Sequence, residues 1–143
     1  MLKMNFKKLN ANAITPTYGT EFSAGADLYS TEKMVIGVGE TKLIKTGLAV
    51  EIPVGYVGLI YARSGLATKR GLAPANKVGV IDSDYRGEIM VALHNHSEAT
   101  AAVEPFERIA QLVIMPIIQA DFERADELSD TVRGAGGFGS TGK

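Results

Sequence analysis

Alternation of apolar with other residues at every second position is the feature that most restricts how this chain folds. It runs through residues 44–52 (IKTGLAVEI) and ends at Pro53. It returns in residues 57–61 and 89–93. A period of two puts alternate side chains on opposite faces of an extended chain. The sequence therefore predicts half-buried β-strands separated by turns.

A further segment is apolar on both faces. Residues 109–115 read IAQLVIM, which suits a strand buried on both sides. Gln111 is the exception within it, and a buried amide requires hydrogen-bond partners. Gln111 is therefore the residue of this strand that needs an explanation.

Helix signals are sparse. Residues 64–71 (SGLATKRG) predict one or two turns, with Ser64 as N-cap and Gly71 just past the C-terminus. An acidic stretch at 122–128 is a second, weaker candidate for a short helix. Short strands, turn residues at roughly 8–12-residue spacing and little helix predict an all-β, jelly-roll-like β-sandwich or distorted barrel with one short helix.

The domain organisation follows from length and from the distribution of glycine. A chain of 143 residues fits one domain. Of its 16 glycines, five fall within the last ten residues. We therefore expect a β domain over residues 1–131 and a flexible Gly-rich arm over 132–143, where Val132 and Phe138 are the large apolar groups.

Composition and charge exclude several classes of protein. With 0 Cys the chain has no disulfides, thiolate metal sites or thiol nucleophiles. A net charge of −1 gives no global positive field toward nucleic acid or an anionic membrane. No apolar run approaches the roughly 20 residues of a membrane span, and the opening MLKMNFKKLN lacks the apolar core of a secretory signal. We expect a cytoplasmic protein with no nucleic-acid or membrane partner.

The segment 79–87 (GVIDSDYRG) is the first candidate for chemistry. Its glycines and flanking alternation predict a β-hairpin. Asp82 and Asp84 offer two carboxylates, either of which would act as a base or metal ligand, and Tyr85 offers a ring that packs a ligand. The alternative is an aspartate in a turn that bonds its own backbone, which the local sequence alone favours.

The segment 62–69 (ARSGLATK) joins a strand end to a helix start. A helix N-terminus presents free N–H groups and a partial positive charge. Together with Arg63, Ser64 and Gly65 these groups suit a phosphate. The alternative is a capped helix with a solvated arginine.

The tail 133–141 (RGAGGFGST) combines Arg133, Phe138 and paired hydroxyls in a Gly-rich chain. Backbone N–H groups of such a chain form an anion nest, and the ring face stacks on a base. A mobile segment of this kind closes over a ligand. The alternative, of equal weight, is a disordered terminus.

Taken together, these segments resemble the dUTP pyrophosphatase (dUTPase) family of the trimeric, all-β type. Five motifs stand in the family's order: AGADLYS at 24–30, ARSGLATKRGL at 62–72, GVIDSDYRGEIMVALHN at 79–95, ERIAQLVI at 107–114 and RGAGGFGSTG at 133–142. The third and fifth are highly specific. Ala62 stands where many members have Pro, and Glu107 where many have Asp. Neither departure replaces a group expected to do chemistry.

The resemblance implies a β-clip homotrimer with shared active sites and an arm that closes over them. It implies Mg²⁺-assisted hydrolysis of dUTP to dUMP and pyrophosphate by in-line attack of water on the α-phosphate, which keeps uracil out of DNA and supplies dUMP for dTMP synthesis. Asp82 matches the general base. Asp27 matches the first-motif acid, which would touch a phosphate-bound Mg²⁺ through water.

The resemblance also implies the substrate contacts. Matches to the phosphate site are Arg63, Ser64, Gly65 and Gln111. Matches to the uracil and sugar site are Asn76, Val80, Ile81, Met90 and, under the deoxyribose, Tyr85. On the arm, Phe138 would stack on uracil, and the other matches are Arg133, Gly139, Ser140 and Thr141. Asp84 and Arg86 flank the site, and we expect them to form ion pairs within the hairpin or between subunits.

Three other functions are weaker interpretations. The dCTP deaminase group shares the fold, but deamination needs a different acid–base group at the base ring. A non-catalytic dUTPase-like regulator would lack the base or the arm, and this chain has both. A generic jelly-roll binding module leaves the five motifs unexplained.

Overall fold

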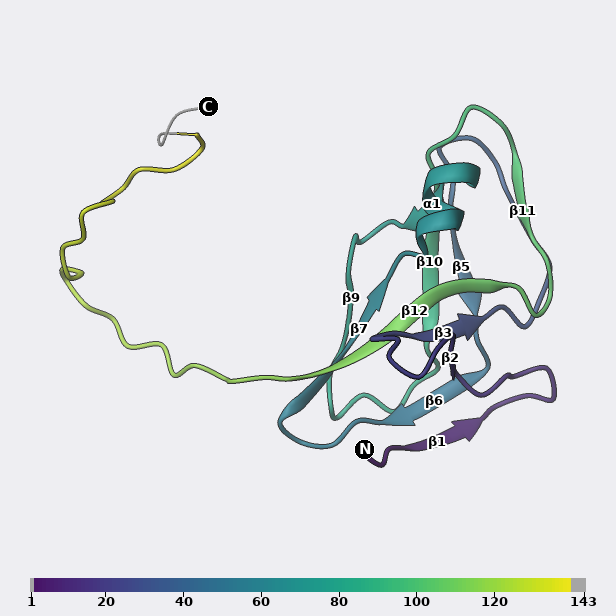
Figure 1. Cartoon of the computed structure of the whole chain (residues 1–143), viewed down its shortest axis with the longest axis horizontal. Helices are drawn as coiled ribbons and strands as arrows, with labels where there is room; N and C mark the ends of the chain where they lie inside the picture. Colours follow the sequence, from purple (N-terminus) through teal and green to yellow (C-terminus); the bar gives the residue numbers. More distant parts are fainter. Residues whose placement is uncertain (1, 140–143) are drawn as a thin grey trace.

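The computed structural model describes residues 2–139. Within this range the regular structure consists of β-strands and one short helix, which confirms the all-β fold class (Figure 1). The helix α1 spans Ser64–Arg70. The strands are β1 (Asn5–Lys8), β2 (Thr17–Tyr18), β3 (Ala26–Tyr29), β4 (Met34–Ile36), β5 (Thr41–Lys45), β6 (Leu48–Glu51), β7 (Tyr56–Tyr61), β8 (Leu72–Pro74), β9 (Gly79–Ile81), β10 (Met90–Asn95), β11 (Ala101–Val103) and β12 (Arg108–Pro116). No helix of the described range is long and apolar enough to cross a membrane.

The largest sheet has the strand order β2-β3-β12-β7-β9, with every pair antiparallel. β12 is its central strand, between β3 and β7. Gln111 on β12 faces Asp27 in one ladder and Tyr61 in the other. The register therefore brings three segments that are distant in sequence side by side, where β7 leads into α1.

Three smaller sheets complete the body: β5-β10-β8, β1-β6 and β11-β4. Their buried side chains join those of the large sheet in one core. Its members with 0% exposure include Leu28, Ile36, Ile44, Leu48, Leu72, Ile89, Leu93 and Ile109. The alternation predicted for residues 44–52 is interrupted between β5 and β6, because Gly47 adopts a left-handed φ of 67° and turns the chain.

The two strands around segment 82–88 do not form the predicted hairpin ladder. β9 pairs with β7, whereas β10 pairs with β5 and β8, so they belong to different sheets. The chain reverses through a turn in which Tyr85 N–H bonds the Asp82 carbonyl at 3.2 Å. Local sequence shows the turn but not the partner strands, which non-local pairing decides.

The helix prediction was right in position and wrong in its cap. Gly71 ends α1 in the left-handed conformation, with φ 66°. The N-cap is Arg63, which is extended and makes no side-chain cap bond, so Ser64 is already helical. No helix forms at 122–128, where the chain runs clear of the body. An isolated helix this short is marginal without a surface on which to bury a face.

Beyond β12 the chain leaves the body as an extended segment, residues 117–139 (Figure 1). Ile117 N–H still bonds the Gly55 carbonyl at 2.9 Å. The next large apolar side chains, Ile118 and Phe122, are 97% and 92% exposed. The body therefore does not bury this segment's apolar groups.

Candidate active site

A polar hollow of about 430 Å³ opens where β3, β12 and the start of α1 meet; we call it the β3–β12 hollow. It is lined by Gly19, Ser23, Ala24, Gly25, Asp27, Arg63, Ser64, Gly65, Arg108 and Gln111. Parts of the first, second and fourth motifs thus meet in one place. The register of the large sheet is what joins them.

Asp27 is the one acid among these lining residues, and it holds two cations. Arg63 Nε donates to Asp27 Oδ1 at 2.9 Å, and Arg108 Nη1 lies 3.3 Å from Oδ2. The Asp27 side chain is only 13% exposed, so the pairing with Arg63 and Arg108 offsets its loss of water. One carboxylate against two guanidinium groups leaves the hollow with an excess of positive charge, which suits an anion.

Gln111 has the partner that its place in an apolar strand requires. Its Nε2 donates to the Ala62 carbonyl at 2.9 Å. Its Oε1 lies where a Cβ on Gly25 would come within 2.6 Å. The side chain is therefore fixed between β7 and the Gly25 backbone, with its amide at the edge of the hollow.

The start of α1 contributes the remaining wall. The first N–H groups of a helix have no partner within the helix and carry partial positive charge. A Cβ added to Gly65 would meet no described atom within 4 Å, so packing within the chain does not require a glycine there. Gly65 lines the hollow at the helix start, with open space where a Cβ would lie.

A second hollow, of about 210 Å³, lies beside the 82–88 turn; we call it the β9–β10 hollow. Its lining is more apolar: Leu43, Val80, Ile81, Asp82, Tyr85, Glu88 and Met90. Tyr85 Oη donates to the Glu88 carbonyl at 2.9 Å. Asn76 does not line it, although this exposed residue lies only three positions before the start of β9.

The two hollows share no lining residue. The predicted site residues that line a hollow therefore fall into two groups, with Asp82 in one and Arg63 and Gln111 in the other. Arg86 donates to the Ser83 carbonyl at 2.7 Å and lies 3.6 Å from Glu51 of β6, so its described ion pair reaches outside the turn, and a pair within the hairpin or between subunits stays a prediction. No described ion pair involves Asp84.

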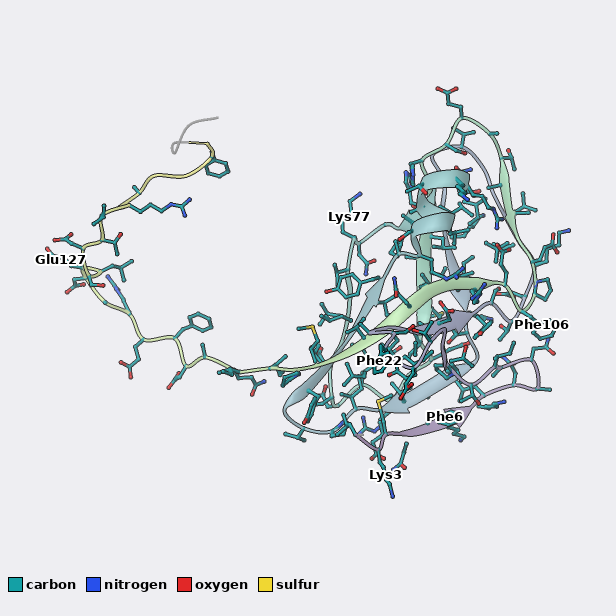
Figure 2. The ribbon with its side chains drawn as sticks, viewed as in Figure 1. Lys3, Phe6, Phe22, Lys77, Phe106 and Glu127 are labelled. Atoms are coloured by element: carbon teal, nitrogen blue, oxygen red, sulfur yellow. The ribbon has the colours of Figure 1, made fainter. Side chains whose placement is uncertain are left out.

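The arm residues lie away from both hollows. Figure 2 shows the segment that carries them running clear of the body, with the labelled Glu127 far from it. Arg133 Nε donates to the Gly136 carbonyl at 2.8 Å, and Phe138 is fully exposed. Gly139 has φ 88°, a conformation that favours glycine. Ser140 and Thr141 lie outside the described residues.

Sequence reasoning missed several lining residues, which include Gly19, Ser23, Arg108, Leu43 and Glu88. Arg108 could have been identified from its place directly before the apolar run 109–115, because a charged residue is unusual at the start of a buried strand. No local signal marks Leu43, which reaches its hollow from β5, the neighbour of β10. Glu88 lies within the third motif and was not singled out there.

Asp27 is the carboxylate of the β3–β12 hollow that could contact a divalent cation. No group of three His, Cys, Asp or Glu side chains within residues 2–139 is arranged to hold a metal. Asp27 uses one oxygen for each arginine, and a carboxylate has about four acceptor sites. It therefore keeps capacity to accept from a metal-bound water.

A family model, curated relatives and solved structures that resemble this chain are all described as dUTPases or as deoxyuridine 5'-triphosphate nucleotidohydrolases. The family model described as dUTPase matches residues 11–142. The deoxyuridine 5'-triphosphate nucleotidohydrolase of Nautilia profundicola is 56% identical over 142 residues, covering 99% of this chain and 100% of that protein. The dUTPase of Staphylococcus bacteriophage 80alpha with dUpNHpp superposes with a TM-score of 0.94 at 33% identity, covering 100% of both chains. A dUTPase from phage phi11 of S. aureus, described with a structural Mg(II) ion, gives 0.84 at 28% identity over 90% of this chain and 100% of that one.

Proposed function

Because the chain belongs to the dUTPase family, we propose that it hydrolyses dUTP to dUMP and pyrophosphate. The observation that carries this proposal is the convergence of Asp27, Arg63 and Gln111 on one hollow with an excess of positive charge. These residues belong to three of the five motifs. A triphosphate needs positive charge around it. Because the net charge of the chain is −1, that positive charge has to be gathered locally, as it is in this hollow.

On the phosphate side, each lining group has a distinct role. Arg63 is held by Asp27 through Nε, which leaves its terminal nitrogens for phosphate oxygens. Ser64 and Gly65 offer backbone N–H groups at the helix start, where anions are stabilised. Gln111 presents its fixed amide to the α-phosphate.

On the nucleoside side, the β9–β10 hollow accepts uracil and deoxyribose. Backbone groups near Val80, Ile81 and Met90, with Asn76, read the base edge, and the tight turn leaves no room for a 5-methyl group. Tyr85 packs under the sugar and excludes a 2′-hydroxyl. A site built for one hydrogen-bond pattern strongly disfavours another, which rejects cytosine.

Asp82 is the general base. It accepts a proton from the water that attacks the α-phosphorus in line, so the P–O bond to the water forms as the bond to the pyrophosphate oxygen breaks. Asp82 and Arg63 line different hollows, and this separation supports a site that combines hollows from two copies of the chain. We propose a homotrimer, in which each site combines hollows of different subunits.

Mg²⁺ bound to the phosphate oxygens would neutralise their charge and fix their conformation. Asp27 would hold it through water, with the two guanidinium groups kept on the same carboxylate. The arm would close the site: Phe138 would stack on uracil, and Arg133, Gly139, Ser140 and Thr141 would approach the phosphates. Hydrolysis of dUTP in the cytoplasm keeps uracil out of DNA and supplies dUMP for dTMP synthesis.

Pyrophosphate release from dUTP, dCTP, dTTP and UTP, each with Mg²⁺, tests the proposal. We expect turnover of dUTP alone. Comparable turnover of dCTP or UTP contradicts the assigned specificity. Ammonia release from dCTP would instead indicate a deaminase, and tight dUTP binding without turnover would indicate a regulator.

A further inference from the structure

Tyr85 is tied to a distant turn through one residue, Glu88. The Tyr85 hydroxyl donates to the main-chain carbonyl of Glu88 at 2.9 Å. The side chain of the same glutamate accepts from the N–H of Gly47 through Oε1 at 2.8 Å. Glu88 therefore joins the ring in the exposed 82–88 turn to the β5–β6 turn.

The ring has little freedom next to its own backbone. A Cβ added to Gly87 would lie 2.4 Å from Tyr85 Oη and 2.5 Å from Cζ. The end of the ring thus lies directly over the chain between Tyr85 and Glu88. Any shift of this backbone moves the ring with it.

The other end of the connection is rigid. Gly47 is buried, and a Cβ there would lie 2.8 Å from Asn10 Nδ2 and 2.9 Å from the Ala13 Cβ. The neighbouring Thr46 is 0% exposed and donates through Oγ1 to the Ile89 carbonyl at 2.6 Å. The Glu88 carboxylate is therefore hydrogen-bonded to a backbone N–H whose position is fixed by the surrounding core.

We infer that Glu88 is a positioning residue: it fixes the Tyr85 ring at the distance from the bound sugar that distinguishes deoxyribose from ribose. The inference rests on the proposed function and adds to it, because Glu88 acts through Tyr85 and not on the reacting atoms. Discrimination by exclusion depends on geometry to about 0.5 Å. An exposed turn without a side-chain anchor does not maintain that accuracy.

The variants Glu88→Ala and Glu88→Gln separate positioning from packing. Alanine removes the acceptor for Gly47 N–H, whereas glutamine keeps a carbonyl oxygen at the same reach. Glu40→Ala is a matched control, because Glu40 Oε2 accepts from Gly37 N–H at the same 2.8 Å in a different turn, away from both hollows. Thermal unfolding of all three variants measures the loss of stability separately.

The readout is the ratio of kcat/KM for dUTP to that for UTP, together with calorimetric affinities for dUpNHpp and its ribose counterpart. We expect Glu88→Ala to lower both ratios by about tenfold, while Glu88→Gln and Glu40→Ala stay near wild type. A ratio that Glu88→Ala leaves unchanged, or that Glu40→Ala lowers equally, overturns the inference. If the wild-type protein binds dUpNHpp but does not turn over dUTP, the proposed reaction fails while the affinity ratio still tests Glu88. If it binds neither analogue, both proposals fail.

Discussion

Asp27 and Arg63 form the contact that ties the first motif to the second, with Arg63 Nε donating to Asp27 Oδ1 at 2.9 Å. The Asp27 side chain is 13% exposed and that of Arg63 29%, so water screens this pair only in part. Arg108 approaches the second oxygen at 3.3 Å. The carboxylate thus orients two cations toward the β3–β12 hollow before any phosphate arrives.

Asp27→Asn removes the charge with little change in size, and it leaves Arg63 and Arg108 without their counter-ion. We expect the free energy of unfolding to fall by about 1–3 kcal/mol. Urea unfolding at neutral pH and one fixed protein concentration measures it. The exposed Asp121→Asn serves as control, with an expected change within about 0.5 kcal/mol. Equal effects of the two substitutions would show that the ion pairs carry no stability.

The parts of this arrangement that the sequence predicts are those with a local signal. Gln111 breaks an apolar strand, and Arg63 stands directly before the predicted helix start. Both signals come from a few neighbouring residues, and both positions line the β3–β12 hollow. By contrast, the pairing of Asp27 with Arg63 spans 36 positions and depends on strand register, which a single sequence does not reveal.

The same limit explains the incorrect expectations. The turn predicted within residues 79–95 is present, but β9 and β10 on either side of it pair with strands of different sheets. Ser64 has the chemistry of an N-cap, yet Arg63 takes that position with its side chain directed to Asp27. The side chain of Glu88 accepts from the N–H of Gly47, which lies 41 positions away in the sequence. Tertiary contacts therefore decide what local propensity leaves open.

Asp82→Asn tests the assigned base. Asparagine keeps the shape of the side chain but does not accept a proton, so we expect kcat for dUTP to fall by about 10²–10⁴-fold. Asp82 is exposed, so the fold should not change. Asp84→Asn is the matched control, two positions along the same turn, and should keep most of the activity. Similar losses in both variants would assign the effect to the turn and not to a base.

Gly25→Ala tests the fixed position of Gln111. The new Cβ would lie 2.6 Å from Gln111 Oε1 and 3.1 Å from its Cβ, while the amide is held by Ala62. We expect a loss of about 1–3 kcal/mol in unfolding free energy from overpacking, together with a lower kcat/KM for dUTP. Gly37→Ala, whose nearest contact would be an ordinary 3.5 Å, is the control and should change neither quantity appreciably. A Gly25→Ala protein with wild-type stability and turnover would contradict the close packing.

Deletion of residues 133–143 tests the arm. The described part of this segment lines neither hollow, so the melting temperature should stay near that of the full chain. If the arm closes over bound nucleotide, kcat/KM for dUTP should fall by about 100-fold because the reacting groups lose their ordered, water-excluded setting. Steady-state kinetics and thermal unfolding measure the two effects. Unchanged kinetics would exclude a catalytic role for the arm.

Mixing two inactive variants tests whether sites are shared between chains. Arg63→Ala damages the β3–β12 hollow and Asp82→Asn the β9–β10 hollow, and no lining residue is common to both. If each site takes one hollow from each of two neighbouring subunits, trimers of each variant alone have only damaged sites. After unfolding and refolding together in equal amounts, random assembly gives an intact pair of hollows in roughly a quarter of the sites. Pyrophosphate release should then recover to that fraction of wild type. The absence of any recovery, with mixed assembly verified by mass, would mean that each chain builds its own site.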